Sequence, residues 1–243
     1  MRRPRSRPRI PEAALDVVPV LDLKQGLVVR ARHGDRDAYR PIETPLAPSA
    51  APLDVARGLL ALHPFRRFYL ADLDGIEGRG RSDAIVDALA AALPQVEFWV
   101  DNGLADAAAC RDWLDGRRAR LVIGSESQTG IDTARALGAG AVLSLDYRGD
   151  AFLGPASLET DAALWPDDVI VMTLARVGSG AGPDLSKLAA ARGRSSGARL
   201  WAAGGVRGVD DLAALRGLAV SGALVATALH DGRLTAADLA TLA

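Results

Sequence analysis

Eight short apolar runs alternate along the chain with stretches that have the spacing of amphipathic helices, and this alternation constrains the fold most. The apolar runs, which we expect to be strands, are residues 17–22, 67–72, 96–101, 120–124, 141–146, 169–173, 199–203 and 222–226. The helical stretches are residues 53–62, 82–93, 105–114, 129–137, 185–192, 209–215 and 236–242, with a weaker candidate at 155–165. Strands that alternate with helices favour a parallel sheet, and eight such units in about 250 residues favour closure into an α/β barrel of the (β/α)8, or TIM-barrel, type.

The two halves of the chain resemble each other. Trp99 and Trp201 are 102 residues apart, and the same separation joins Gly103 to Gly205. The run Val-Leu-Asp-Leu at 20–23 also has a counterpart, Leu-Ser-Leu-Asp-Tyr, at 143–147. Several agreeing pairs indicate an internal repeat, with an accidental match of alanine-rich sequence as the alternative. We therefore predict one barrel domain over residues 17–243, built from two duplicated half-barrels.

Composition and charge exclude several classes of protein. The 243 residues are 49% hydrophobic and carry a net charge of -1, which favours neither nucleic acid nor an anionic membrane as a partner. The three histidines and the single cysteine, Cys110, provide no disulfide framework and no cysteine-based zinc spacing, so we expect no metal and no cofactor. No apolar run is long enough to span a bilayer, and we expect a cytoplasmic location.

The first residues of the chain are unusually basic. Five of the first nine residues are arginines, broken by two prolines, and no apolar segment of a secretory signal follows. We interpret residues 1–16 as a basic, disordered tail, because blocks of like charge are usually solvated. An arm that touches phosphate or RNA is the alternative.

In a barrel of this kind the active site lies at the carboxyl ends of the strands. The polar and small residues at those ends are Asp22, Asp72, Asp101, Ser125, Asp146, Thr173, Gly204, Gly205 and Thr227. Asp22 and Asp146 fall on the first and fifth strands, on opposite sides of the ring. One could therefore remove a proton from a substrate and the other could return it. The alternative for each aspartate is a helix cap or an ion pair with Lys24 or Arg148.

A glycine-rich run, Ala-Ala-Gly-Gly-Val-Arg-Gly at 202–208, ends the seventh strand and enters a helix. Glycines let the backbone approach a ligand closely, and its N–H groups can cradle a phosphate. Ala226 and Thr227, after the eighth strand, are placed to complete this cup. A simple tight turn is the alternative.

The equivalent place in the first half holds Asp101, Asn102 and, after the fourth strand, Glu126. Carboxylates in a mouth of low dielectric constant repel an anion. We therefore expect one working phosphate site, with a cationic, hydroxylated or heterocyclic group bound on the opposite side. Asp101 turned away into a salt bridge is the alternative.

A long loop rich in proline and charge, residues 31–51, follows the first strand. Loops of this length in a compact domain often act as lids over a site. His33 in this loop could titrate usefully, and an exposed histidine without a role is the alternative.

Several of these motifs resemble one family. Residues 18–30, Val-Pro-Val-Leu-Asp-Leu-Lys-Gln-Gly-Leu-Val-Val-Arg, resemble the opening strand and loop of the histidine-biosynthesis barrels HisA and HisF. Residues 68–75 resemble their second strand, 143–149 their fifth, and 204–212 their seventh unit. The resemblance covers nearly all of residues 17–243 and is greater to HisA, the phosphoribosylformimino-AICAR ribotide isomerase.

The resemblance to HisA has implications for the site. It implies an Amadori aldose-to-ketose isomerisation on a substrate with a phosphate at each end. By position, Asp22 matches the general base. Asp146 matches an aspartate that orients or activates the sugar, and Thr173 matches a threonine at the end of the sixth strand.

The chain departs from the family pattern at three places. The family reads Arg-Asp-Gly-Thr after the sixth strand, and that aspartate is the general acid of the isomerase. Here the run at 176–179 is Arg-Val-Gly-Ser, so Val177 occupies the acid position. The glycine-rich turn after the third strand has become Asp-Asn-Gly, and a Gly-Arg after the eighth has become Ala-Thr. The resemblance therefore implies a divergent HisA-like paralogue, without ordinary HisA activity.

Three hypotheses for the function follow. The first is an enzyme that uses acid–base chemistry on a singly phosphorylated small molecule, in an isomerisation or a lyase-type step. For this enzyme the resemblance alone suggests a role in one-carbon cofactor metabolism (methanopterin or methanofuran). The second is a genuine HisA isomerase with another group as the acid, and the third is a non-catalytic barrel that binds a phosphorylated ligand or a protein. The candidate residues are, for catalysis, Asp22, Asp146, Thr173 and Asp101; for phosphate, Gly204, Gly205, Ala226 and Thr227; and for other substrate contacts, Asp72, Asn102, Ser125, Arg176 and Ser179.

Overall fold

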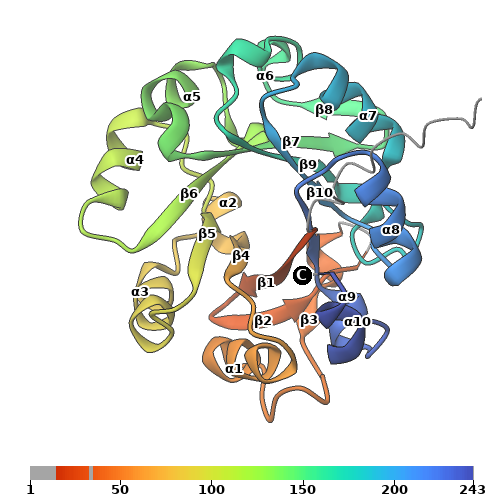
Figure 1. Cartoon of the computed structure of the whole chain (residues 1–243). Coiled ribbons are helices and arrows are strands. Elements are labelled where there is room, and N and C mark those ends of the chain that lie inside the picture. Colours follow the sequence, from red (N-terminus) through yellow and green to blue (C-terminus); the bar gives the residue numbers. More distant parts are fainter. Residues whose placement is uncertain (1–14, 33–34, 243) are drawn as a thin grey trace, which may run out of the picture.

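Eight parallel strands close into a barrel in the computed structural model, which describes residues 15–32 and 35–242 (Figure 1). Around the ring the strands are β1 (Asp16–Lys24), β4 (Arg67–Asp72), β5 (Glu97–Asp101), β6 (Ala119–Gly124), β7 (Val142–Arg148), β9 (Asp168–Thr173), β10 (Arg199–Ala203) and β11 (Gly222–Val225). The ring closes where β11 pairs with β1, from Asp16 opposite Gly222 to Pro19 opposite Val225. The predicted α/β barrel of the TIM type is confirmed, and all eight predicted strands are present.

Helices lie outside the strands in Figure 1 and cover the barrel. They are α1 (Pro52–Leu62), α3 (Asp83–Ala92), α4 (Ala107–Leu114), α5 (Asp132–Leu137), α6 (Ala156–Thr160), α7 (Leu185–Arg194), α8 (Val209–Gly217) and α10 (Ala236–Ala240). The stretch at 155–165, the weaker helix prediction, is divided into α6 and a 3-10 turn (Ala162–Leu164), because Asp161 ends the first and caps the second through the N–H of Ala163.

Short elements that the sequence did not predict surround the mouth of the barrel. A hairpin of β2 (Leu27–Arg30) and β3 (Arg40–Pro41) extends from β1, with a 3-10 turn (Arg36–Ala38) between its strands. The strand β8 (Ala151–Leu153) pairs with β7, and the four-residue helices α2 (Leu73–Ile76) and α9 (Thr227–His230) follow β4 and β11. These elements occupy the carboxyl ends of the strands, where they shape the opening.

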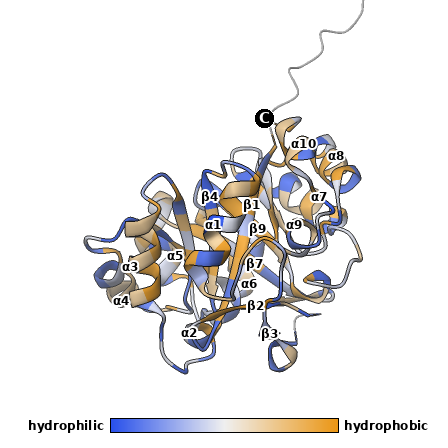
Figure 2. Cartoon of the chain, turned by 90° about the horizontal axis from the view of Figure 1, so that it is seen from below, coloured by the Kyte–Doolittle hydropathy of each residue, from blue (hydrophilic) through white to orange (hydrophobic). Residues whose placement is uncertain are grey.

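Two apolar layers stabilise the barrel, and the alternation of side chains along each strand separates them. Phe68 and Leu70 of β4 belong to the layer between strands and helices, whereas Tyr69 between them belongs to the layer inside the ring. Figure 2 shows the hydrophobic strands, β1 and β9 among them, between helices with hydrophilic outer sides. The inner layer fills the barrel at one end and leaves a cavity at the other.

The amino ends of the strands are closed by two tryptophans from equivalent strands of the two halves. The rings of Trp99 on β5 and Trp201 on β10 meet edge to face, with centroids 4.8 Å apart. Below them Asp168 accepts hydrogen bonds from Arg120, Arg199 and the Trp201 indole. The contact between positions 102 residues apart agrees with the predicted repeat.

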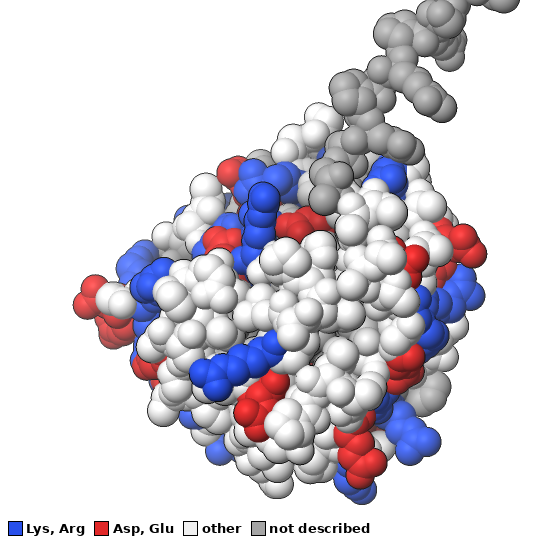
Figure 3. All heavy atoms as spheres, turned by 60° about the horizontal axis from the view of Figure 1, so that its bottom comes forward, with Lys and Arg blue, Asp and Glu red and all other residues white. Residues whose placement is uncertain are grey.

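The described residues begin two positions before the predicted start of the barrel. Of the predicted tail, residues 1–16, only Leu15 and Asp16 are described, and Asp16 already belongs to β1. On the face that Figure 3 presents, basic and acidic side chains are interspersed. Within residues 15–32 and 35–242, no helix has the length and apolar character needed to cross a membrane.

Candidate active site

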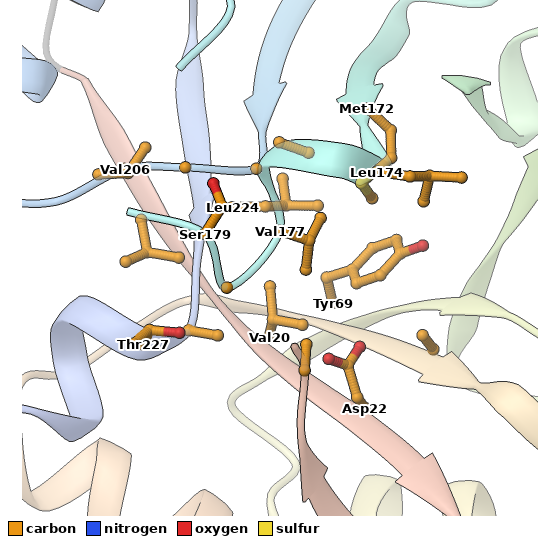
Figure 4. Close-up of a pocket in the computed structure, with 18 of the residues that line it drawn as sticks. Val20, Asp22, Tyr69, Met172, Leu174, Val177, Ser179, Val206, Leu224 and Thr227 are labelled. Atoms are coloured by element: carbon orange, nitrogen blue, oxygen red, sulfur yellow. The ribbon is translucent and has the colours of Figure 1, made fainter. Parts of the chain in front are cut away.

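A cavity of about 360 Å³ opens at the carboxyl ends of the barrel strands (Figure 4). Its wall contains apolar side chains and two sets of polar groups. One set is acidic, namely Asp101, Glu126 and Asp146 at the carboxyl ends of β5, β6 and β7, with Asp22 across the mouth on β1; the other part of the wall is the backbone of the glycine turn after β10 and the start of α9. Both sets come from the candidates at the strand ends, so the barrel brings most of the predicted site together.

Asp22 points into the cavity from β1, close to Val20 and across from Val177 in Figure 4. The strand alternation places Val18, Val20 and Asp22 on the inner side, and Leu21 and Leu23 under the helices. Burial raises the pKa of the Asp22 carboxyl from 3.8 to about 7, and the charge of Arg36 only partly opposes this. A carboxyl with this pKa changes its protonation state readily at neutral pH, as a general base must.

On the other side of the cavity Asp146 is held firmly by hydrogen bonds. Its carboxylate accepts the hydroxyl of Ser144 at 2.6 Å, the hydroxyl of Ser125 at 3.2 Å and the N–H of Glu126 at 3.1 Å. Burial nevertheless raises its pKa to about 7, assisted by the charge of Glu126. Ser125 is therefore a residue that orients Asp146; it also accepts the backbone N–H of Asp146 at 2.9 Å.

Asp101 is also buried, and its surroundings favour the protonated form. Burial and the charges of Asp146 and Glu126 raise the pKa of Asp101 to about 7, and the N–H of Gly103 and the charge of Arg36 oppose them. The hydroxyl of Tyr69 donates to Asp101 at 3.3 Å. The alternative in which Asp101 turns away into a salt bridge does not occur in this structure, because the side chain lines the cavity and contacts Tyr69.

One arginine crosses the mouth of the barrel toward the acidic side. Arg36, in the loop between β2 and β3, forms an ion pair of 2.5 Å with Glu126, which follows β6. The amino group of Lys24 holds the carbonyl of Arg36 at 2.6 Å, and Tyr39 of the same loop lines the cavity. The loop predicted to act as a lid thus contributes part of the cavity wall. His33 lies outside the described residues.

Replacing Glu126 with glutamine is expected to lower the pKa of both Asp101 and Asp146. The charge of Glu126 is a cause of the raised pKa at both positions, and its removal also frees Arg36 to attract the remaining carboxylates. Titration of ¹³C-labelled aspartate carboxyls by NMR measures the two values. Glu43→Gln, at an exposed glutamate, is the matched control. Unchanged values in Glu126→Gln would mean that the charge of Glu126 does not contribute to either pKa.

The glycine turn after β10 has the open backbone predicted for a phosphate cup. Gly204 and Gly205 have φ of +98° and +90°, and no backbone carbonyl among the described residues accepts the N–H of Gly204, Gly205 or Val206. Ala226 and Thr227 adjoin this turn in the cavity wall, and Thr227 begins α9. Free N–H groups that converge on a cavity can bind an anion without a charged side chain.

Gly205→Ala is expected to weaken phosphate binding strongly. A Cβ at this position lies 2.2 Å from the carbonyl oxygen of Gly182, and the φ of +90° disfavours any side chain, so the turn must move. A ³¹P NMR titration with ribose 5-phosphate measures the effect. Gly193→Ala is the control and leaves binding unchanged, because this position in α7 has open space for the new methyl group beyond the helix's own backbone. Equal binding by both variants would contradict a role for this turn.

Five of the predicted site residues lie outside the cavity wall, and one of them is Ser125, which holds Asp146 from behind. Asp72 caps α2 and accepts the N–H of Ser82 at 2.6 Å. Thr173 is buried without a hydrogen-bond partner for its hydroxyl among the described residues, and Asn102 accepts the N–H of Leu104. The remaining residue, Arg176, donates to the carbonyl of Gly182 at 2.9 Å and so holds the loop after β9.

Ser179 and Val177, in contrast, do line the cavity. Val177 brings a methyl-bearing side chain to the place where the resemblance implies a general acid (Figure 4). Sequence reasoning missed further residues of the wall, namely Tyr39, Tyr69, Asp231 and Arg233. For Tyr69 the period-two pattern of β4 was an available signal, since it shares the inner face with Ala71. Among the described residues, no cluster of three or more acidic, histidine or cysteine side chains is arranged to hold a metal ion.

Comparison with known proteins agrees with this architecture. The model of the family described as histidine biosynthesis protein matches residues 16–235. The 1-(5-phosphoribosyl)-5-((5-phosphoribosylamino)methylideneamino) imidazole-4-carboxamide isomerase of Roseobacter denitrificans is 32% identical over 237 residues, covering 90% of this chain and 95% of that protein. The isomerase of the same name from Rubrobacter xylanophilus is 31% identical, covering 94% and 97%. An uncharacterised protein of Methanocaldococcus jannaschii is 26% identical, covering 90% and 95%. This chain belongs to the histidine biosynthesis protein family, that of the HisA and HisF barrels.

Proposed function

We propose that this barrel is an enzyme that binds a small molecule with one phosphate group and moves a proton next to its carbonyl or imine carbon. An isomerisation or a lyase-type step through an enol is the reaction class. The observation that carries the proposal is Asp22, a carboxyl with no hydrogen-bond partner in residues 15–32 and 35–242, which faces the cavity with a pKa of about 7.

Asp22 acts as the base in this proposal. Its pKa lies near neutral pH, so a large fraction of Asp22 is ionised and able to accept a proton. The carboxylate is also a stronger base than that of an ordinary aspartate, because its pKa is higher. The apolar surroundings of Val20 and Val177 keep water from stabilising the carboxylate. These two features together make Asp22 reactive toward a substrate C–H rather than toward solvent.

Asp101 is the better candidate for the acid. Asp146 accepts three hydrogen bonds, which favour its ionised form and occupy its lone pairs. Within the described part of the chain Asp101 accepts two hydrogen bonds, from the Tyr69 hydroxyl and the N–H of Gly103, both at 3.3 Å, and two neighbouring carboxylates disfavour its charge. A protonated Asp101 can therefore donate to a substrate oxygen, while Asp146 orients the sugar.

The charge distribution supports a single phosphate. The glycine turn offers free N–H groups, whereas the wall formed by β5, β6 and β7 carries three carboxyl groups, those of Asp101, Glu126 and Asp146, against two guanidinium groups, those of Arg36 and Arg148. A second phosphate on that side would face net negative charge in a buried place. The group bound there is therefore polar or cationic.

Solvent exchange tests the proposal without knowledge of the product. The protein is incubated in D₂O with ribose 5-phosphate or erythrose 4-phosphate, and loss of the proton signal next to the carbonyl is followed by NMR. We expect exchange with the phosphorylated sugars and none with ribose or erythrose. Binding of the phosphorylated sugars without any exchange would leave a barrel that only binds its ligand.

Genuine HisA activity is the second candidate, because relatives at 31–32% identity carry the name of that isomerase. Val177 at the position of the general acid, and the carboxyl groups where a second phosphate would bind, disfavour this activity. Expression in a bacterial strain that lacks the isomerase decides: growth without histidine would replace our proposal with this one. No feature of the cavity bears on one-carbon cofactor metabolism, which stays a prediction from the resemblance.

A further inference from the structure

The rim beside the phosphate cup carries more positive than negative charge. Asp231, which follows α9, forms ion pairs with both Arg30, at 2.8 Å, and Arg233, at 3.2 Å. Two guanidinium groups thus share one carboxylate, which leaves a surplus of one positive charge. Asp231 and Arg233 line the cavity together with Thr227, and the carbonyl of Arg233 lies beside Gly208 of the glycine-rich loop.

The other arginines near the cup are fully engaged. Arg207 makes a bidentate ion pair with Asp211, with distances of 2.9 and 2.7 Å. Arg176 donates to the carbonyls of the loop after β9 and pairs with Asp184 at 3.5 Å. Arg233, in contrast, makes a single hydrogen bond within the described part of the chain, the one to Asp231. Among the arginines of this rim, Arg233 therefore loses the fewest hydrogen bonds when its side chain changes rotamer.

We propose that Arg233 closes on the phosphate of the bound substrate, exchanging its ion pair with Asp231 for one with the phosphate while Arg30 continues to neutralise Asp231. This inference rests on the proposed phosphate cup and adds the cation that the cup otherwise lacks. Asp231 then acts as a competitor that holds Arg233 at the rim until a phosphate arrives.

The physical reason lies in the strength and geometry of the two ion pairs. The Arg233 side chain is 42% exposed and that of Asp231 38%, so the pair between them is screened by water and weak. A phosphate seated on the backbone N–H groups of the cup offers two oxygens to a guanidinium fork, in a place with less water. The exchange also leaves no charge unpaired, because Arg30 stays on Asp231.

The test is a ³¹P NMR titration with ribose 5-phosphate at low salt. Arg233→Gln is expected to weaken binding about tenfold, and Arg233→Lys less, because an ammonium keeps the charge but loses the fork. Asp231→Asn is expected to bind at least as tightly as the wild type, because the competitor for Arg233 is gone. Arg118→Gln, at an exposed arginine near Pro94, controls for the loss of one positive charge.

The outcomes separate this inference from the proposed function. A wild-type protein that does not bind ribose 5-phosphate would overturn both the cup and the role of Arg233. Binding that Arg233→Gln and Arg118→Gln retain equally would overturn the role of Arg233 and keep the cup. If Asp231→Asn weakens the binding of ribose 5-phosphate as much as Arg233→Gln does, the ion pair between the two residues only stabilises the rim, and the inference is overturned. If Arg148→Gln, at the arginine of the cavity wall at the end of β7, is the one variant that loses binding, the phosphate binds at that wall and the inference is likewise overturned.

Discussion

Asp168→Ala is expected to lower the free energy of unfolding by about 3 kcal/mol. The Asp168 side chain is only 2% exposed, and it accepts hydrogen bonds from Arg120 at 2.6 Å, Arg199 at 2.7 Å and the Trp201 indole at 2.9 Å. Its removal leaves a partly buried guanidinium and a buried indole N–H without an acceptor at the closed end of the barrel. Urea-induced unfolding followed by circular dichroism measures the loss.

The pH dependence of this loss checks its cause. Burial alone raises the pKa of Asp168, but the hydrogen bonds from Arg199, Arg120 and Trp201 outweigh it and lower the pKa from 3.8 to about 2. The stabilisation is therefore complete above pH 4 and is lost as the pH falls toward 2. Asp167→Ala is the matched control, because the neighbouring Asp167 is 66% exposed and lies 3.9 Å from Arg199. A similar loss in both variants would contradict the role of the buried network.

The barrel itself could be predicted because its strands are apolar on both faces and recur at regular spacing. The predicted strand at 169–173 is β9 at Asp168–Thr173, and the other strands agree to within two residues. The short elements at the mouth escaped prediction for the opposite reason. β8 has three residues and α9 four, too few for a period of two or 3.6 to be recognised.

The sequence predicted at which end of the barrel the candidate residues lie, but not which of their side chains face the cavity. Choosing the residue at the end of each strand ignores that successive side chains face opposite sides of the sheet. Tyr69 and Ala71 face the inside of the barrel, so Asp72 faces away from it and caps a helix. On β9 Met172 lines the cavity, and Thr173 next to it does not. Counting the period from the first inward residue of each strand would have separated these residues in advance.

The residues of the rim could not be predicted by any such rule. Arg36 and Arg233 lie in segments where no periodicity applies, and the contacts of this rim join parts of the chain that are far apart in the sequence. Arg36 reaches Glu126, 90 residues away, and Arg30 reaches Asp231 across the junction of the first and last units. Only the three-dimensional arrangement shows which of the arginines in this chain face the cavity.

Asp22→Asn is expected to lower the rate of solvent exchange in phosphorylated sugars by about 10²–10⁴-fold, because an amide cannot take up the proton. Binding of ribose 5-phosphate stays within about twofold, since the amide keeps the size of the carboxyl group. The rate comes from the loss of the proton signal in D₂O, and the affinity from the ³¹P titration. Asp112→Asn, at an exposed aspartate of α4, is the control and keeps the full rate.

The dependence on pH distinguishes a base from a residue that only shapes the cavity. With a pKa of about 7, Asp22 is protonated at low pH, so the wild-type rate rises through about pH 7 and then levels off. Because this pKa is raised above 3.8, ionisation of Asp22 costs stability progressively as the pH rises from about 4 to 7. Asp22→Asn should therefore be more stable than the wild type at pH 8 and about equal at pH 4. An Asp22→Asn variant that is inactive yet more stable than the wild type shows that the carboxylate destabilises the fold and serves the reaction. A variant that loses both activity and stability would show that Asp22 has a structural role in the barrel instead.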